Sequence, residues 1–232
     1  MQLIGVDGCP GGWIAVTYDI AARTLTPQFH SSFQAVLGAY SDAEVVAVDI
    51  PIGLAESVSR RCDDEARRSL GPPRGSSVFP APDPRLLGET VYKDALARSR
   101  SLNNKGISIQ TFMICPKVAE VNGVMTPELQ ERVIEIHPEV SFWAAAGMRS
   151  MTYTKSKPEG YEERRAILAR VLERPIWSRE EARTVARPAV PDDVLDATVA
   201  AWTARRVAEA RAGRFPIEGE RDRRGLRMEI VY

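Results

Sequence analysis

The sequence predicts an α/β fold in which three antiparallel strands are followed by a helix and then by a buried parallel strand. Short apolar or β-branched runs end at Asp7, cover 13–18 and cover 24–30, and brief turn-forming segments separate them, which indicates a β-meander. Apolar residues then recur with helical spacing over 33–40. The run at 44–50 is almost continuously apolar, as expected of a strand buried on both faces. The predicted order is therefore β-β-β-α-β.

The remaining elements follow from weaker signals. Residues 51–130 mix a Pro/Gly/Ser stretch at 71–84 with helical patterns around 64–70, 86–102 and 108–121. We interpret this region as a helical insertion, at about 55–130, in a single domain that covers 1–232. Beyond it we expect a strand at 133–137, helices at 159–172 and 192–212 with a linker at 174–191 between them, and a short strand at 226–232.

The composition is that of a soluble globular protein. The 232 residues are 44% hydrophobic and 27% charged, which excludes disordered, fibrous and membrane classes. Because 31 basic residues balance 31 acidic ones, nucleic acid or a membrane would need a local basic patch. Three widely spaced cysteines argue against disulfides and thiolate zinc sites, and we see neither a signal peptide nor a transmembrane segment. We expect a cytoplasmic protein with no membrane partner, and the sequence leaves its oligomeric state open.

Two aspartates occupy equivalent places, each directly after an apolar strand. Asp7 precedes the Gly-rich turn at 8–12, and Asp49 precedes Pro51 at the end of the 44–50 run. If the two strands are parallel neighbours, their carboxyl ends lie side by side, where open α/β sheets form ligand sites. Two adjacent carboxylates need a proton or a divalent cation between them, and Mg²⁺ or Mn²⁺ suits such hard oxygen ligands. The structural alternative is that each aspartate only caps the turn that follows it.

A third source of carboxylates is the start of the last predicted helix. Asp193 and Asp196 are three residues apart, so they share one helix face, and Asp192 is expected to be the N-cap. Behind them, small residues form a stripe that lets the helix approach the sheet closely: Ala197, Ala200, Ala201 and Ala204. That approach carries Asp196 toward Asp7 and Asp49. The predicted result is a metal site of Asp7, Asp49 and Asp196, whose natural chemistry is two-metal-ion phosphoryl transfer.

Five motifs together resemble the family of predicted RNase H-fold nucleases catalogued as domain of unknown function 429. They span most of the chain and comprise 5–13 (GVDGCPGGW), 49–54 (DIPIGL), 76–79 (SSVF), 135–139 (EIHPE) and 192–197 (DDVLDA). The resemblance implies an RNase H-like mixed sheet of order 3-2-1-4-5 with strand 2 antiparallel, flanked by helices and carrying a helical insertion after strand 4.

The 192–197 motif also resembles the final helix of RuvC-type Holliday-junction resolvases. By position, that likeness implies the acids Asp7, Asp49, Asp193 and Asp196 as the catalytic set, with Asp193 as auxiliary ligand or base. The resolvases carry glutamate at the fourth strand, so Asp49 is one methylene shorter. Family resemblance also favours four basic residues as substrate contacts: Arg60, Arg67, Lys117 and Lys157.

Other polar residues allow both a functional and a structural interpretation. Strand alternation places Glu135 and His137 on one face near the end of the 133–137 strand, where an auxiliary role in the site is one interpretation. The other interpretation is structural, with His137 as a hydrogen-bonded, partly buried imidazole. Basic clusters such as Lys155, Lys157, Arg164 and Arg165 are usually solvated faces, although binding of a polyanion requires only local positive charge.

The sequence supports one leading hypothesis and two alternatives. The first is a metal-dependent nuclease that hydrolyses phosphodiester bonds through its carboxylate cluster and uses Mg²⁺ or Mn²⁺. The second is a non-catalytic protein that binds a nucleotide or nucleic acid on the same fold, because Asp7 with its glycines also resembles the phosphate loop of actin-like ATPases and sugar kinases. The third is a structural cation site without a ligand.

Overall fold

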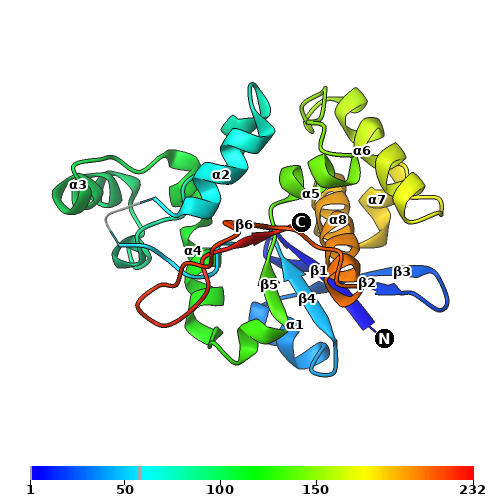
Figure 1. Cartoon of the computed structure of the whole chain (residues 1–232), viewed down its shortest axis with the longest axis horizontal. Helices are drawn as coiled ribbons and strands as arrows, with labels where there is room; N and C mark the ends of the chain where they lie inside the picture. Colours follow the sequence, from blue (N-terminus) through cyan, green and yellow to red (C-terminus); the bar gives the residue numbers. More distant parts are fainter. Residues whose placement is uncertain (1, 57–58) are drawn as a thin grey trace. The chain divides into compact units, whose positions relative to one another are not determined.

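A computed structural model of the chain describes residues 2–56 and 59–232 (Figure 1). The chain divides into two compact units. The sheet unit comprises Met1–Asp49, Arg132–Gly213 and Val231–Tyr232. The insertion unit comprises Ile50–Glu131 and Arg214–Ile230, so most of it follows the fourth strand.

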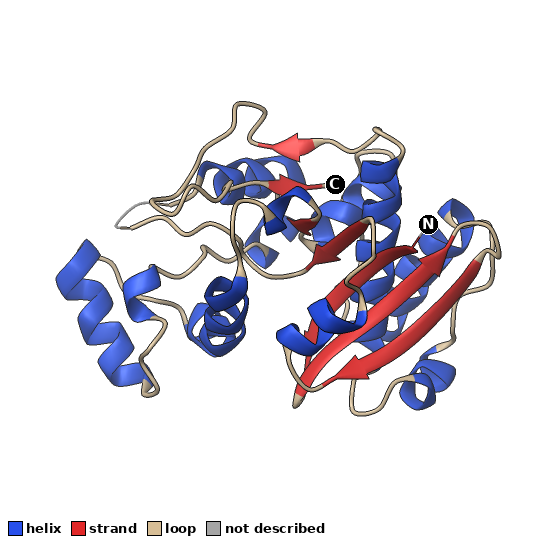
Figure 2. Ribbon diagram, turned by 90° about the horizontal axis from the view of Figure 1, so that it is seen from below, coloured by secondary structure: helices blue, strands red, loops and turns tan. Residues whose placement is uncertain are grey.

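A five-stranded mixed sheet organises the sheet unit. Its strands are β1 (Gln2–Cys9), β2 (Gly12–Asp19), β3 (Thr24–His30), β4 (Val45–Val48) and β5 (Val133–Glu135), in the order β3-β2-β1-β4-β5. β2 is antiparallel to both β1 and β3, whereas β1, β4 and β5 are parallel. Figure 2 shows the three longer strands, β1 to β3, side by side as the meander that the turn signals predict. The predicted strand order and the antiparallel second strand are confirmed.

Five helices belong to the sheet unit among its described residues: α1 (Phe33–Ala39), α5 (Pro138–Ala145), α6 (Pro158–Val171), α7 (Arg179–Val185) and α8 (Pro191–Ala208). The sequence does not predict α5. The expected linker at 174–191 is wrong in part, because a capping box at Ser178 and Glu181 starts α7 inside it. The last helix runs over Pro191–Ala208 and not over 192–212, because proline fits the first helical position.

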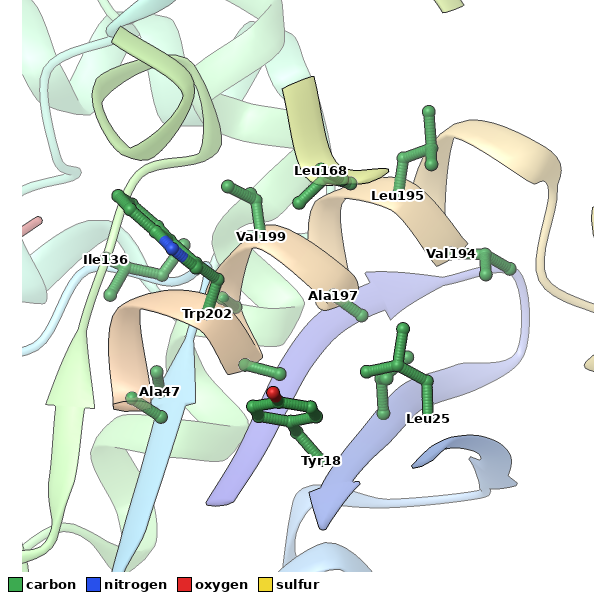
Figure 3. Packing of buried hydrophobic residues seen from close by; sticks show 14 of the residues in the cluster. Tyr18, Leu25, Ala47, Ile136, Leu168, Val194, Leu195, Ala197, Val199 and Trp202 are labelled. Atoms are coloured by element: carbon green, nitrogen blue, oxygen red, sulfur yellow. The ribbon is translucent and has the colours of Figure 1, made fainter. Parts of the chain in front are cut away.

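Successive side chains along each strand point to opposite faces of the sheet. Leu3 and Ala47 belong to the main apolar core together with the α8 residues Ala197 and Val199, as Figure 3 shows in part. On β2, Trp13 points the other way and packs on Phe33 of α1, with ring centroids 5.1 Å apart. Helix α8 therefore covers one face of the sheet and α1 contacts the other.

Helix α8 approaches the sheet very closely at Gly5. A Cβ atom at this position would lie 2.0 Å from the carbonyl oxygen of Ala197 and 2.1 Å from the amide nitrogen of Ala201. The stripe of small residues on α8 is fully buried against this point: Ala197, Ala200, Ala201 and Ala204. Any side chain on β1 here would hold the helix away from the sheet.

The insertion unit is mainly helical. It contains α2 (Arg61–Leu70), η1 (Arg74–Ser77), η2 (Pro84–Leu86), α3 (Tyr92–Asn103), α4 (Ile109–Val124) and η3 (Leu129–Glu131). Leu86, Ala95, Ile107 and Cys115 form a small apolar cluster of its own. The helical patterns predicted around 64–70 and 108–121 are confirmed, whereas the pattern around 86–102 forms an α-helix only from Tyr92.

Two short strands are the last strands of the described structure. β6 (Arg214–Phe215) and β7 (Ile230–Val231) form a two-stranded sheet, so the strand expected at 226–232 is shorter than predicted. Within residues 2–56 and 59–232, none of the helices combines the length and the apolar character needed to cross a bilayer.

Candidate metal centre

Asp7 and Asp49 lie on the same face of the sheet because they share the alternation of their strands. Asp7 is two residues beyond Gly5 on β1, and Asp49 is two residues beyond Ala47 on β4. The amide of Asp49 still donates to the carbonyl of Val6, over 2.9 Å, so the parallel pairing continues to that residue. Both carboxylates therefore point to the face that α8 covers.

Helix α8 adds the third carboxylate. The close approach at Gly5 brings Asp196 to the carboxyl ends of β1 and β4. Asp7, Asp49 and Asp196 each offer an oxygen atom, and these three atoms all lie within 4.8 Å of one another. Asp7 and Asp196 are buried, with 7% and 2% exposure, whereas Asp49 keeps part of its surface open to solvent. The predicted convergence of these acids is thus present in the fold.

Burial and mutual repulsion disfavour full ionisation of this cluster. Burial raises the pKa of Asp7 well above its usual range, and the charges of Asp49 and Asp196 raise it further. Burial also raises the pKa of Asp49 to about 8, again with a contribution from Asp196. The cluster therefore favours any proton or cation that can reach it.

A cation is already present in the form of Lys155. Its Nζ lies 2.7 Å from Oδ2 of Asp196, and the charge of Asp196 raises the pKa of Lys155 against the effect of burial, with Asp7 and Asp49 adding to the rise. Lys155 lies in the irregular segment between α5 and α6. The sequence places it only within a basic cluster, because no periodic pattern connects this segment with β1 or β4.

The side chains of Glu163 and Arg164 hold the segment that carries Lys155. The carboxylate of Glu163 accepts from the amides of Thr152 and Tyr153, over 2.8 and 3.0 Å. Arg164 donates to the carbonyl of Tyr153 over 3.1 Å and forms an ion pair with Glu139. Both partners of that ion pair are buried. These contacts fix the backbone immediately before Lys155.

A close backbone contact fixes the same segment from the other side. Gly160, in the first turn of α6, packs so tightly that a Cβ atom would lie 1.9 Å from the carbonyl oxygen of Thr154. The amide of Lys157 donates to the same carbonyl over 3.1 Å. The backbone on both sides of Lys155 is therefore held by contacts other than the ion pair with Asp196.

The first turn of α8 corrects one expectation. Asp192 is not the N-cap, because the helix begins one residue earlier and Val190 occupies that position. Asp193 provides the cap, since its Oδ2 accepts from the amide of Val190 over 2.9 Å. Burial raises the pKa of Asp193 to about 6, against the effect of that hydrogen bond. Asp193 lies outside the group of three converging carboxylates.

Neither Glu135 nor His137 belongs to the group of three converging carboxylates. Glu135 is in register with Val48, and its neighbours Ile134 and Ile136 belong to the core under α8, so alternation directs Glu135 to the opposite face. Its charge still contributes to the raised pKa of Asp49. His137 is the N-cap residue of α5, and its carbonyl accepts the amides that open this helix.

The four predicted substrate contacts are spread over both units. Arg60, Arg67 and Lys117 belong to the insertion unit, and Lys157 is exposed at the N-cap of α6. Arg60 is buried, with an ion pair to Asp63 over 2.6 Å and hydrogen bonds to two backbone carbonyls. Arg60 therefore has a structural role, and its contact with a substrate stays a prediction.

Arg67 and Lys117 have different surroundings. Arg67 donates to the carbonyl of Val78 over 2.6 Å and lines a pocket of about 360 Å³ in the insertion unit, together with Asp64, Lys105 and Thr111. Lys117 is half-buried on α4. Their roles as substrate contacts also stay predictions.

The donor set fits a hard divalent cation. Three carboxylates supply only oxygen ligands, which is the preference of Mg²⁺ and Mn²⁺. The ammonium of Lys155 shows that this place already attracts positive charge. The partial exposure of Asp49 leaves a route from solvent.

Fold and site together define an α/β protein that carries a carboxylate cluster at the carboxyl ends of two parallel strands. A family described as protein of unknown function (DUF429) matches residues 5–221, and the chain belongs to this family. No curated protein and no solved structure matches the chain.

Proposed function

We propose that this protein is a nuclease with an RNase H-like fold that hydrolyses phosphodiester bonds with a bound Mg²⁺ or Mn²⁺. The observation that carries the proposal is the cluster of Asp7, Asp49 and Asp196, whose oxygen atoms lie within 4.8 Å of one another. The acids come from β1, β4 and α8, which are the elements that the resemblance to RuvC-type resolvases names. The raised pKa values of Asp7 and Asp49 add support, since ordinary structural aspartates avoid such burial.

The carboxylates would hold the cation, and Asp193 would assist. When bound, a divalent ion lowers the pKa of a coordinated water and neutralises charge on the phosphate. Asp193, with a pKa of about 6, is ionised at neutral pH and suited to accept a proton from the attacking water. The water oxygen forms the new bond to phosphorus, the ester P–O bond breaks, and the departing oxygen takes up a proton. The products are one phosphomonoester and one alcohol.

The test uses the purified chain with Mn²⁺ and a panel of end-labelled substrates: single- and double-stranded DNA, RNA and a branched junction. We expect wild-type protein to cleave at least one of them. Asp7→Asn should reduce cleavage to background while raising the free energy of unfolding, because it removes a carboxyl group whose ionised form is disfavoured in the folded state. A gain in stability together with a loss of activity is the expected signature of a functional carboxylate.

Asp42→Asn is the matched control, because Asp42 is exposed in the loop before β4. This variant should leave both cleavage and stability unchanged. If wild-type protein cleaves no phosphodiester but is stabilised by a nucleotide or nucleic acid, the binding alternative replaces the nuclease proposal. If Asp7→Asn cleaves as fast as wild type, the carboxylate cluster is not the active site.

A further inference from the structure

We propose that Lys155 is a catalytic residue whose ammonium takes the place of a second metal ion, so that the site works with one divalent cation and one lysine. This inference rests on the nuclease function proposed above and concerns which charges perform the reaction. It departs from the two-metal chemistry that the sequence predicts. Lys155 would contact an oxygen of the phosphate and stabilise its negative charge during displacement.

The geometry places the ammonium against one carboxylate of the cluster, that of Asp196. Nζ of Lys155 lies 2.7 Å from Oδ2 of Asp196, which is a full charge-assisted hydrogen bond. The side chain of Asp196 is 3% exposed, whereas that of Lys155 is 53% exposed. The lysine therefore reaches the buried carboxylate from the solvent side, which is the side from which a phosphate must arrive. A metal ion cannot take the same oxygen lobe while the ammonium holds it.

The charges support one metal ion. Asp7, Asp49 and Asp196 carry three negative charges when ionised, and Lys155 returns one positive charge. One divalent cation then makes the cluster neutral, whereas two would leave an excess of two positive charges. Beside the buried carboxylates of Asp7 and Asp196, such an excess is disfavoured. Lys155 and a single divalent ion therefore balance the negative charge of the three carboxylates.

The protein also fixes the backbone beside Lys155. The buried ion pair of Arg164 with Glu139 fixes the carbonyl of Tyr153, and the backbone contact at Gly160 fixes Thr154. The side chain of Lys155 therefore extends toward Asp196 from a fixed backbone. Preorganised positive charge is what stabilises a developing charge without reorganisation.

The experiment counts bound Mn²⁺ by isothermal titration and by the loss of the free-ion electron paramagnetic resonance signal. It compares wild-type protein with Lys155→Met, Lys155→Arg and Lys93→Met. Lys93 is exposed on α3 and controls for the loss of one positive charge elsewhere. We expect one Mn²⁺ in wild type, in Lys155→Arg and in Lys93→Met, and two in Lys155→Met. With only the first ion bound, Lys155→Met should turn over about 100-fold more slowly.

The possible results separate this inference from the proposed function. Two Mn²⁺ in wild-type protein would overturn the role of Lys155 while leaving the nuclease proposal intact, and this count needs no variant to fold. One ion in Lys155→Met with undiminished turnover would overturn it as well. No Mn²⁺ in wild-type protein would overturn the metal-dependent function and this inference with it.

Discussion

The tightest test of the architecture is the replacement of Gly5 by alanine. The new Cβ would lie 2.0 and 2.1 Å from backbone atoms of Ala197 and Ala201, whereas ordinary contacts begin at 3.4 Å. Backbone atoms in the middle of an 18-residue helix cannot turn aside as a flexible side chain can. Helix α8 must therefore move away from β1 as a body, and Asp196 moves with it.

The displacement of α8 should lower the stability of the folded protein. Overpacking a core by one methyl group costs about 1–3 kcal/mol when side chains can adjust. Because only backbone can adjust here, we expect a loss of about 3 kcal/mol or more in the free energy of unfolding. For a protein of this size, that loss corresponds to a fall of roughly 6–12 °C in Tm. The displaced Asp196 should also weaken Mn²⁺ binding.

Chemical denaturation and Mn²⁺ titration of Gly5→Ala measure both effects. Gly38→Ala is the matched control, because Gly38 is exposed in α1 and a Cβ there meets nothing within 4 Å. That variant should be neutral or up to about 1 kcal/mol more stable, since alanine favours helices. A Gly5→Ala protein as stable as wild type, with unchanged Mn²⁺ affinity, would refute the close packing of α8 on β1.

Two further predictions concern the buried charges. Without metal, the sheet unit should lose stability as the pH rises from about 4 to 8. The pKa of Asp49 is about 8 in the folded protein and 3.8 in the unfolded chain. Between these values the folded state keeps a proton that the unfolded state releases, so a rise in pH favours unfolding. Urea unfolding at several pH values measures how the free energy of unfolding falls with pH, and Asp49 should contribute at most about 1.4 kcal/mol per pH unit to this slope. Asp49→Asn should remove this contribution, and Asp42→Asn should retain it. Arg164→Met should destabilise the protein by about 3–5 kcal/mol, since it leaves the carboxylate of Glu139 buried without its partner. Adding Glu139→Gln should recover part of that loss, and equal stability of the single and double variants would contradict this account.

The strand-borne half of the site could be predicted from the sequence. Asp7 and Asp49 each interrupt an apolar run at its end, and strand alternation then decides the face on which they lie. Asp196 follows from the run of alanines behind it, because small residues on a helix indicate close packing. These arguments use periodic patterns, which can be recognised in a single sequence.

The lysine at the site could not be predicted in the same way. Lys155 lies in an irregular segment, and its position depends on Glu139, Glu163 and Arg164, none of which shows a pattern that links it to the sheet. The shift of the N-cap from Asp192 to Val190 has a similar origin. Valine has no side-chain acceptor, so the cap comes from Asp193, three residues later.

The wide separation of Asp7, Asp49 and Asp196 along the chain has a consequence for protein synthesis. The ribosome produces Asp7 and Asp49 first, and Asp196 follows only after a further 147 residues (196 − 49). A nascent or truncated chain that lacks α8 therefore has no complete set of ligands. Under the proposed function, hydrolytic activity would begin only once translation has passed residue 196, and unfinished chains would be harmless to the nucleic acids around them.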